Sequence, residues 1–191
     1  AASVKWLLVE GFLPSAIINS LIHIGNKTPK EIFTLEEALE WFDLKNISKS
    51  PARFDIDKLK FINGQHLRNM EAKELSRYVG FADESIGQIA KIYLEDARTL
   101  KELRPKIEAL LAEKVIHEAF TEQAEVIRKV IIAAPYFEEF DDFKAHIMKE
   151  SGLKGKNFFK PLRLLLSGAE HGPELEAMYP FIKNYMTEIV K

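Results

Sequence analysis

Apolar side chains recur at helical spacing along this chain, and no stretch alternates apolar and polar residues over enough length to predict a sheet. One apolar stripe follows Thr121 and stops at Pro135, a residue that ends helices. Its members are Val126, Ile127, Val130, Ile131 and Ala134. A second stripe lies near the C-terminal end, where Pro180 predicts a kink. Its members are Leu175, Met178, Phe181, Ile182, Tyr185 and Ile189. The sequence therefore predicts an all-α fold.

Capping signals indicate where several helices begin and end. Proline at the start and glycine at the end predict a helix over Pro14–Ile24, closed by Gly25. A capping box at Thr34 opens a second helix. A third helix is predicted over Ile56–Ile62, with Asn63-Gly64 as its stop.

Two irregular stretches suggest how the chain is divided. Asp43–Phe54 is polar and contains a proline, which predicts a loop, and Leu103–Lys106 contains a weak break around a second proline. We therefore expect a helical segment over residues 1–70 and two small helical bundles over residues 71–105 and 106–191.

Composition excludes several classes of protein. The 191 residues are 47% hydrophobic, which is ample for a buried core. No run approaches the roughly 18 to 20 apolar residues that span a bilayer, and no secretory signal opens the chain. The absence of cysteine excludes disulfides and thiolate zinc sites and fits a reducing compartment. We expect a cytoplasmic monomer without a membrane partner.

Positive charge is concentrated in two stretches although the net charge is −2. Six Lys or Arg residues lie between Lys45 and Arg68, and six more lie between Lys144 and Arg163. Such clusters fit a polyanion-binding surface, because phosphate binding needs local positive potential. Ordinary solvated faces would give the same pattern, and charge alone leaves both interpretations open.

Three stretches together resemble bacterial glutamyl-tRNA synthetases and cover essentially the whole chain. The C-terminal stretch, Lys154–Leu175, reads KGKNFFKPLRLLLSGAEHGPEL, and Ser48–Arg68 reads SKSPARFDIDKLKFINGQHLR. Ser3–Asn26 reads SVKWLLVEGFLPSAIINSLIHIGN and is similar to the segment that follows the catalytic KMSKS-type loop. The resemblance implies the C-terminal, tRNA-binding part of a larger class I glutamate–tRNA ligase. It also implies that residues 1–70 are a helical linker or stem-contact segment and that the two bundles form an anticodon-binding cage.

The resemblance also implies partners and chemistry. In the parent enzyme, ATP with magnesium activates glutamate, which then passes to glutamate tRNA, and glutamine tRNA stays open as a second substrate. These steps belong to a catalytic domain of the same polypeptide, so we expect this chain to be inactive alone and to hold no cofactor or metal. A free-standing helical RNA-binding or adaptor protein derived from this region is the alternative.

Two short strings imitate catalytic motifs of class I synthetases. His23-Ile24-Gly25-Asn26 looks like a HIGH motif, and Asn46–Ser50 looks like a KMSKS loop. The histidine is expected at a helix C-terminal end, where the helix dipole repels phosphate, and the two strings are too close together for a divided Rossmann-type fold. No histidine pair or HExxH motif indicates a metal, and Ser167 lacks a nucleophile-elbow pattern. We therefore predict no catalytic residue and no metal site.

The C-terminal signature contains the main candidates for anticodon recognition. A Pro-started apolar helix is expected to keep Arg163 in its first turn, beside free backbone N–H groups. By resemblance, the anticodon lies near Lys160, Pro161, Arg163, His171, Gly172, Pro173 and Leu175. The alternative for Arg163 is a pair with a neighbouring carboxylate, and core packing is expected for Phe158 and Phe159.

Basic residues of both signatures are candidates for contact with the tRNA backbone. They are Lys49, Arg53, Lys58, Arg68, Lys154 and Lys156. Such contacts would position the tRNA more than read its sequence. Structural ion pairs, for instance between Arg53 and Asp55 or Asp57, and simple solvation of the loop are the alternatives.

One position departs from the family pattern. Relatives that distinguish glutamate tRNA from glutamine tRNA commonly carry an arginine that reads the third anticodon base, and the matching position here is Asp96. Arg98 is the nearest arginine and a possible substitute after a shift in helix register. A carboxylate accepts a hydrogen bond from a cytosine amino group but cannot make the bidentate arginine contact. We therefore expect relaxed or altered discrimination between the two tRNAs.

Overall fold

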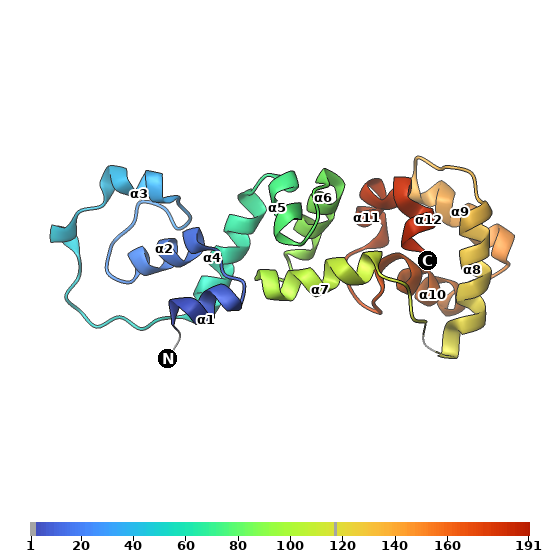
Figure 1. The fold of residues 1–191 in the computed structure, drawn as a ribbon, viewed down its shortest axis with the longest axis horizontal. Coiled ribbons are helices and arrows are strands. Elements are labelled where there is room, and N and C mark those ends of the chain that lie inside the picture. Colours follow the sequence, from blue (N-terminus) through green and yellow to red (C-terminus); the bar gives the residue numbers. More distant parts are fainter. Residues whose placement is uncertain (1–2, 117) are drawn as a thin grey trace.

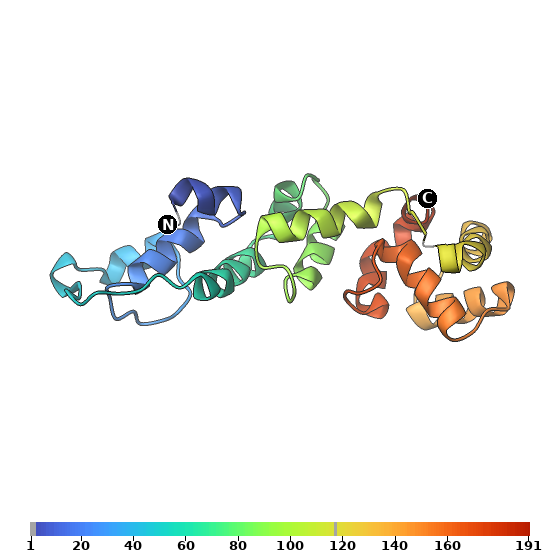
Figure 2. The same cartoon turned by 90° about the horizontal axis from the view of Figure 1, so that it is seen from below.

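The chain folds into an elongated series of helices, as Figure 1 shows. The structure, a computed structural model, describes residues 3–116 and 118–191. Within these two ranges every regular element is a helix and none is a strand, which confirms the all-α prediction. The N-terminal helices lie at one end of the molecule and the C-terminal bundle lies at the other (Figures 1 and 2).

The N-terminal segment is built around the packing of α2 on α4. Its elements are α1 (Val4–Val9), α2 (Pro14–His23), α3 (Leu35–Trp41), η1 (Leu44–Asn46) and α4 (Ile56–Asn69). The predicted capping box is confirmed, because the Thr34 hydroxyl accepts from the Glu37 N–H at 3.2 Å and the Glu37 carboxylate accepts from the Thr34 N–H at 2.9 Å. Leu59, Ile62 and Leu67 of α4 are fully buried.

The predicted stop at Asn63-Gly64 is wrong, because α4 continues to Asn69. The Asn63 side chain is buried, where its oxygen accepts from the Leu13 N–H at 2.8 Å and its amide donates to the Arg98 carbonyl at 2.6 Å. Gly64 is buried beneath the carbon atoms of the Arg98 side chain. Tertiary contacts thus favour the helical backbone at two residues that usually end helices.

A buried polar network ties α2 to α4. The Asn19 side-chain oxygen accepts from the Phe33 N–H at 3.1 Å and lies 2.9 Å from His66 Nε2. Because that oxygen is an acceptor, the imidazole is the Nε2–H tautomer and donates. Burial lowers the pKa of the His66 imidazole, against a smaller opposing effect of the Glu37 carboxylate. Burial in this network therefore favours the neutral form of His66.

The first bundle consists of α5 (Ala72–Tyr78), α6 (Glu84–Tyr93) and α7 (Leu100–Leu111). Asp83 and Thr99 cap α6 and α7 through their side-chain oxygens. Helices α5 and α6 approach so closely that a Cβ atom on Gly87 would lie 1.7 Å from the Ala72 carbonyl oxygen. Only glycine fits at this crossing.

The predicted break around Pro105 is wrong, because α7 runs through this residue to Leu111. A proline removes one hydrogen bond to the carbonyl of the residue four positions earlier, here Lys101. Both residues are exposed, so water can replace the lost bond. The division into residues 1–70, 71–105 and 106–191 stays a prediction.

The second bundle surrounds the buried ring of Phe158. Its elements are η2 (Glu118–Phe120), α8 (Thr121–Ala133), α9 (Phe140–Ser151), α10 (Lys156–Ser167), α11 (Leu175–Ile182), η3 (Lys183–Tyr185) and α12 (Met186–Ile189). Helix α8 ends before Pro135 as predicted. The C-terminal stripe is divided after Ile182, where η3 begins, and Pro180 lies inside α11. Within residues 3–116 and 118–191, no helix combines the length and the apolar character that crossing a membrane requires.

Candidate nucleic-acid interface

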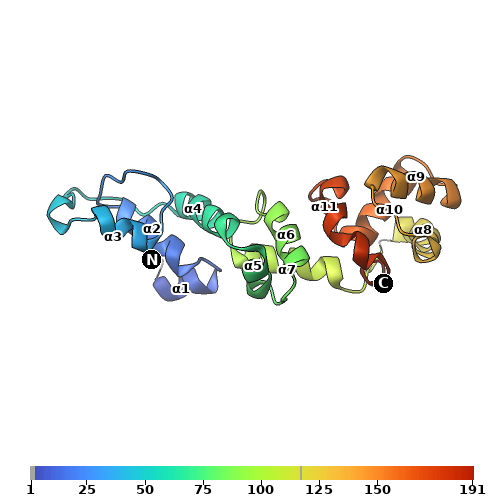
Figure 3. The same ribbon diagram turned by 90° about the horizontal axis from the view of Figure 1, so that it is seen from above.

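An open groove of about 570 Å³ lies where the first bundle meets the second. Helix α6 and the turn after it form one wall, and the loop before α11, with α11 itself, forms the other. Figure 3 shows α6 and α11 as neighbours at the junction of the two bundles. The lining residues are Arg68, Gln88, Lys91, Ile92, Glu95, Asp96, Gly172, Pro173, Glu174, Ala177 and Phe181. The groove thus combines cations, carboxylates and apolar surface.

The groove brings together candidates from separate parts of the sequence. Arg68 comes from the last turn of α4, and Asp96 comes from the turn after α6. Gly172 and Pro173 come from the loop that follows α10. These four residues belong to three of the segments singled out in the sequence, so folding assembles them into one surface.

Arg163 fixes the loop that forms one side of this groove. Its Nη1 donates to the Pro173 carbonyl at 2.9 Å, and the side chain is half-buried. Gly172 has a φ of 151°, and a Cβ atom there would lie 3.9 Å from the same Nη1. Burial raises the pKa of the neighbouring Tyr93 phenol, and the Arg163 charge partly offsets this shift.

The predicted position of Arg163 in a first helical turn is wrong. Helix α10 begins at Lys156, with Gly155 as its N-cap, so Arg163 lies in the second half of the helix, away from the free N–H groups. The sequence prediction placed the start at Lys160-Pro161, but the helix accommodates this proline internally. The alternative carboxylate pair is also absent from the described residues, because the partner is a backbone carbonyl.

The remaining C-terminal candidates are divided between core and surface. Pro161 and Leu175 are buried, whereas Lys160 and His171 are exposed. Of the two phenylalanines expected in the core, Phe158 is buried. Phe159 is 46% exposed, which corrects that expectation, and its ring makes an edge-to-face contact with the ring of Phe158. Lys154 and Lys156 are exposed beside the start of α10.

Arg98 does not line the groove, although it is close to Asp96 in the sequence. Its side-chain carbons lie over Gly64, one helical turn before Arg68 on α4. Its backbone is held at both ends, since its N–H donates to Glu102 at 2.9 Å and its carbonyl accepts from Asn63. Asp96, like its neighbour Glu95, is exposed in this turn and lines the groove.

The N-terminal basic candidates form a separate surface. Lys49, Arg53 and Lys58 are exposed on the loop before α4 and on its first turns. Figure 1 shows this loop at the opposite end of α4 from the groove. Among the ion pairs of the described residues, none includes a backbone candidate of the sequence analysis, so the suggested pairing of Arg53 is not observed.

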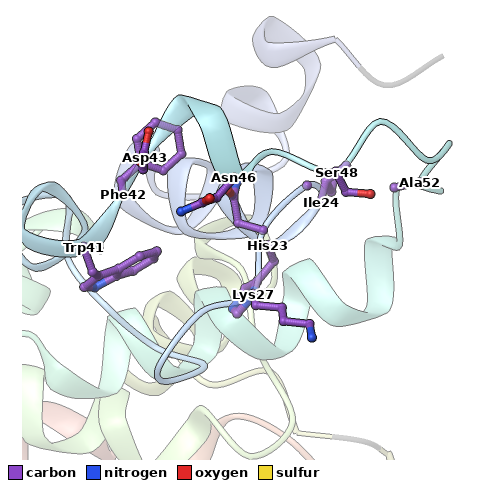
Figure 4. Close-up of a pocket in the computed structure, with 11 residues that line it drawn as sticks. His23, Ile24, Lys27, Trp41, Phe42, Asp43, Asn46, Ser48 and Ala52 are labelled. Carbon is purple, nitrogen blue, oxygen red and sulfur yellow. The ribbon is translucent and has the colours of Figure 1, made fainter.

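A second pocket, of about 660 Å³, lies near the N-terminal tip between the ends of α2 and α3 and the following loop (Figure 4). His23 lies at the end of α2, as predicted. Its Nε2 is 2.6 Å from the Glu31 carbonyl and its Nδ1 is 3.1 Å from the Thr28 hydroxyl. The Ser48 N–H donates to the Gly25 carbonyl at 2.7 Å. These polar groups serve the local fold, which supports the structural interpretation of both motif-like strings.

Metal coordination finds no support within the described residues. No group of three or more histidine, cysteine, aspartate or glutamate side chains there could hold a metal ion. His117, one of the five histidines of the sequence, lies outside the described residues.

Sequence reasoning missed several residues that line the groove. Gln88, Lys91 and Glu95 follow one another at helical spacing on α6 and the turn after it, and Glu174 lies on the opposite wall. A polar stripe on an amphipathic helix usually indicates only a solvated face. The neighbouring wall, which the sequence does not reveal, turns this face into a groove.

Comparison with known proteins identifies the family of this chain. The model of the anticodon-binding domain family matches residues 65–187. Over its full length the chain is 66% identical to glutamate–tRNA ligase 2 of Sulfurimonas denitrificans and 59% identical to glutamate–tRNA ligase 1 of Nitratiruptor sp.. It spans 44% of the length of each of these two relatives. The predicted resemblance is thereby confirmed.

Solved structures agree on the fold. A glutamate tRNA ligase from Elizabethkingia meningosepticum, solved in complex with its amino acid, superposes with a TM-score of 0.69 at 22% identity. The match covers 96% of this chain and 41% of that one. The glutamate-tRNA synthetase of Elizabethkingia anophelis gives 0.65 at 24% identity, with the same coverage. Together with the matched family model, these findings show that the chain belongs to the anticodon-binding domain family.

Proposed function

We propose that this chain is the tRNA-binding C-terminal region of a class I glutamate–tRNA ligase, and that the groove between the two bundles receives the anticodon loop. The observation that carries the proposal is the convergence of Arg68, Asp96, Gly172 and Pro173 on one groove. The identity to ligases along the entire chain favours this function over a free-standing adaptor.

The chemistry of the groove suits unpaired bases better than a phosphate backbone alone. Arg68 and Lys91 can donate to base edges or phosphates, whereas Glu95, Asp96 and Glu174 can accept from base amino groups. Loop nucleotides are unstacked and offer such edges, and apolar side chains of the groove can contact their faces. A groove of mixed charge therefore favours an anticodon loop as its ligand.

The exposed basic residues supply a second, sequence-independent contact. Lys49, Arg53 and Lys58 lie at one end of α4, and Arg68 lies at its other end. Cations without carboxylate partners are available to phosphate oxygens, and such contacts fix orientation. Lys154 and Lys156 are exposed beside the start of α10 and are proposed as further backbone contacts.

Ligation itself is assigned to residues outside this chain. In this proposal a catalytic domain of the same polypeptide binds ATP with magnesium, activates glutamate and charges glutamate tRNA. The region described here contributes affinity, anticodon identity and the placement of the acceptor end. We further propose that it works as a monomer in the cytoplasm.

Titration with tRNA across salt concentrations tests the function. Binding of glutamate tRNA should weaken linearly on a log–log plot against salt, because each phosphate contact releases counterions. Arg68→Gln should make the slope shallower by about one unit if Arg68 contacts a phosphate. Arg77→Gln on the exposed face of α5 is the matched control. Absence of binding at low salt, or equal affinity for tRNAs with unrelated anticodons, would refute the proposal.

Asp96 leads to an expectation about tRNA choice. A carboxylate in the groove lacks the bidentate reach of an arginine, so we expect the complete ligase to charge glutamine tRNA as well as glutamate tRNA. Aminoacylation of both purified tRNAs by the full-length enzyme, compared with its Asp96→Arg variant, measures this. The variant should favour glutamate tRNA more strongly. A strong preference for glutamate tRNA in the unaltered enzyme would contradict the expectation.

A further inference from the structure

Lys114 is a buried cation that no part of the tRNA-binding proposal uses. Its side chain lies in the connection between α7 and α8, and the residue is only 7% exposed. The ammonium donates to three backbone carbonyls, those of Leu110 at 2.6 Å, Ala112 at 3.0 Å and Ile189 at 2.8 Å. All three of its N–H groups therefore have an acceptor, and none of the three acceptors is a carboxylate.

These contacts join the end of α7 to the C-terminal end of the chain. The Lys114 N–H donates to the Lys191 carbonyl at 2.9 Å, and Arg128 Nε on α8 donates to the Val190 carbonyl at 2.6 Å. The carbonyls of Ile189, Val190 and Lys191 are thus all held by the connection or by α8. A charge placed at the C-terminal ends of two helices also meets the negative ends of both dipoles.

The Lys114 contacts lie where the end of α7 meets the end of the chain, whereas the groove lies between α6 and α11. Beside the groove, α6 packs on α11, and the Tyr185 hydroxyl donates to Asp83 at 3.1 Å. At the end of α7, a Cβ atom on Gly168 would lie only 2.4 Å from the Ala109 carbonyl oxygen, so α10 also approaches α7 closely. The contacts at the end of α7 and the contacts between α6 and α11 are separate attachments. Because the bundles are held at both places, neither attachment can act as a hinge about which they rotate.

The charge of Lys114 is near its titration range. Burial and, to a smaller extent, the nearby Arg128 guanidinium together lower the pKa of the ammonium to about 8. The ammonium is therefore mostly charged at neutral pH but loses its proton readily in alkali. The neighbouring ionic groups are Arg128 and its partner Glu125 on α8, Lys191 at the chain end and Glu113 in the connection.

We infer that Lys114 is a positioning residue, whose ammonium holds the two bundles in the relative orientation that forms the tRNA groove. The inference rests on the proposed function for its effect on tRNA binding. Its structural part concerns the orientation of the bundles and can be measured without tRNA.

Spin-label distances test the structural part. The chain has no cysteine, so Arg77→Cys on α5 and Lys149→Cys on α9, both exposed, would carry the only labels. Pulsed electron paramagnetic resonance should give one narrow distribution of label-to-label distances at neutral pH. We expect this for the labelled chain without further substitution and for the control Lys129→Met on the exposed face of α8. Lys114→Met should broaden or shift the distribution, because methionine fills a similar volume but donates no hydrogen bond.

The same variants test the functional part. Binding of glutamate tRNA by Lys114→Met should fall about tenfold, the loss expected for a hydrogen-bonded charge. If the variant does not fold, the otherwise unmodified labelled chain should show the same broadening at pH 9.5. An unchanged distance distribution, or a changed distribution with unchanged affinity, would overturn the inference. If the unaltered chain does not bind tRNA, the proposed function is refuted instead. The spin-label distances would still test whether Lys114 fixes the orientation of the two bundles, because that measurement needs no tRNA.

Discussion

Replacing Arg163 by alanine should weaken the binding of glutamate tRNA by about 1 to 3 kcal/mol, the range typical of an arginine that determines a nucleic-acid contact. The guanidinium holds the Pro173 carbonyl at 2.9 Å, and Pro173 lines the groove. Without this bond the loop before α11 loses its anchor, so one wall of the groove loses its fixed position. Fluorescence titration at constant salt measures the effect.

A matched variant separates this effect from the loss of a surface cation. Arg104 also donates to a backbone carbonyl, that of Tyr78 at 2.8 Å, but it lies on α7 and does not line the groove. Arg104→Ala should therefore change the affinity much less than Arg163→Ala. Equal losses in both variants would indicate a general electrostatic effect and reject a specific role for Arg163. Circular dichroism should show that both variants keep their helices.

Replacing Gly87 by alanine should lower the free energy of unfolding by about 3 kcal/mol, the upper range for overpacking a core. The added methyl carbon would lie 1.7 Å from the Ala72 carbonyl oxygen and 2.3 Å from its carbon. Because both atoms belong to the backbone of α5, no side chain can move aside, and the two helices must separate. Urea unfolding monitored by circular dichroism measures the change.

Gly64→Ala is the control for this substitution. Gly64 is also a buried helical glycine, but its added Cβ would lie 3.5 Å from the nearest atom, which is an ordinary contact with the flexible Arg98 side chain. Alanine there should raise the free energy of unfolding by up to about 1 kcal/mol, since glycine is a poor helix former. If the Gly87→Ala variant is as stable as the unaltered chain, α5 and α6 do not cross as closely as described here.

Local sequence signals predicted those features that local chemistry decides. The capping box at Thr34, the end of α8 before Pro135 and the position of His23 at the end of α2 all depend on neighbouring residues, and the structure has them. The same rules predicted a stop at Asn63-Gly64, where a distant partner for each residue favours a continuous helix.

Features that depend on distant parts of the chain could not be predicted in this way. The groove requires α6 to lie opposite the loop before α11, and no spacing within either segment indicates this arrangement. The sequence analysis singled out Arg163, but the bond of this residue to Pro173 depends on how the chain turns after α10. The predictions at Pro161 and Pro105 were wrong because both prolines lie inside helices. A helix tolerates proline where the lost hydrogen bond is close to its first turn or where water can replace the missing donor.

Helix α4 is uninterrupted, so it is a rigid element. Its length is roughly 21 Å, at a rise of 1.5 Å for each of its 14 residues. Lys58 lies in its first turn and Arg68 in its last. One rigid helix therefore connects the loop that carries Lys49 and Arg53 to the groove. A tilt imposed on α4 at the loop end must displace Arg68 at the other end. The two surfaces are therefore geometrically coupled, and the distance between them is set by the backbone of a single helix.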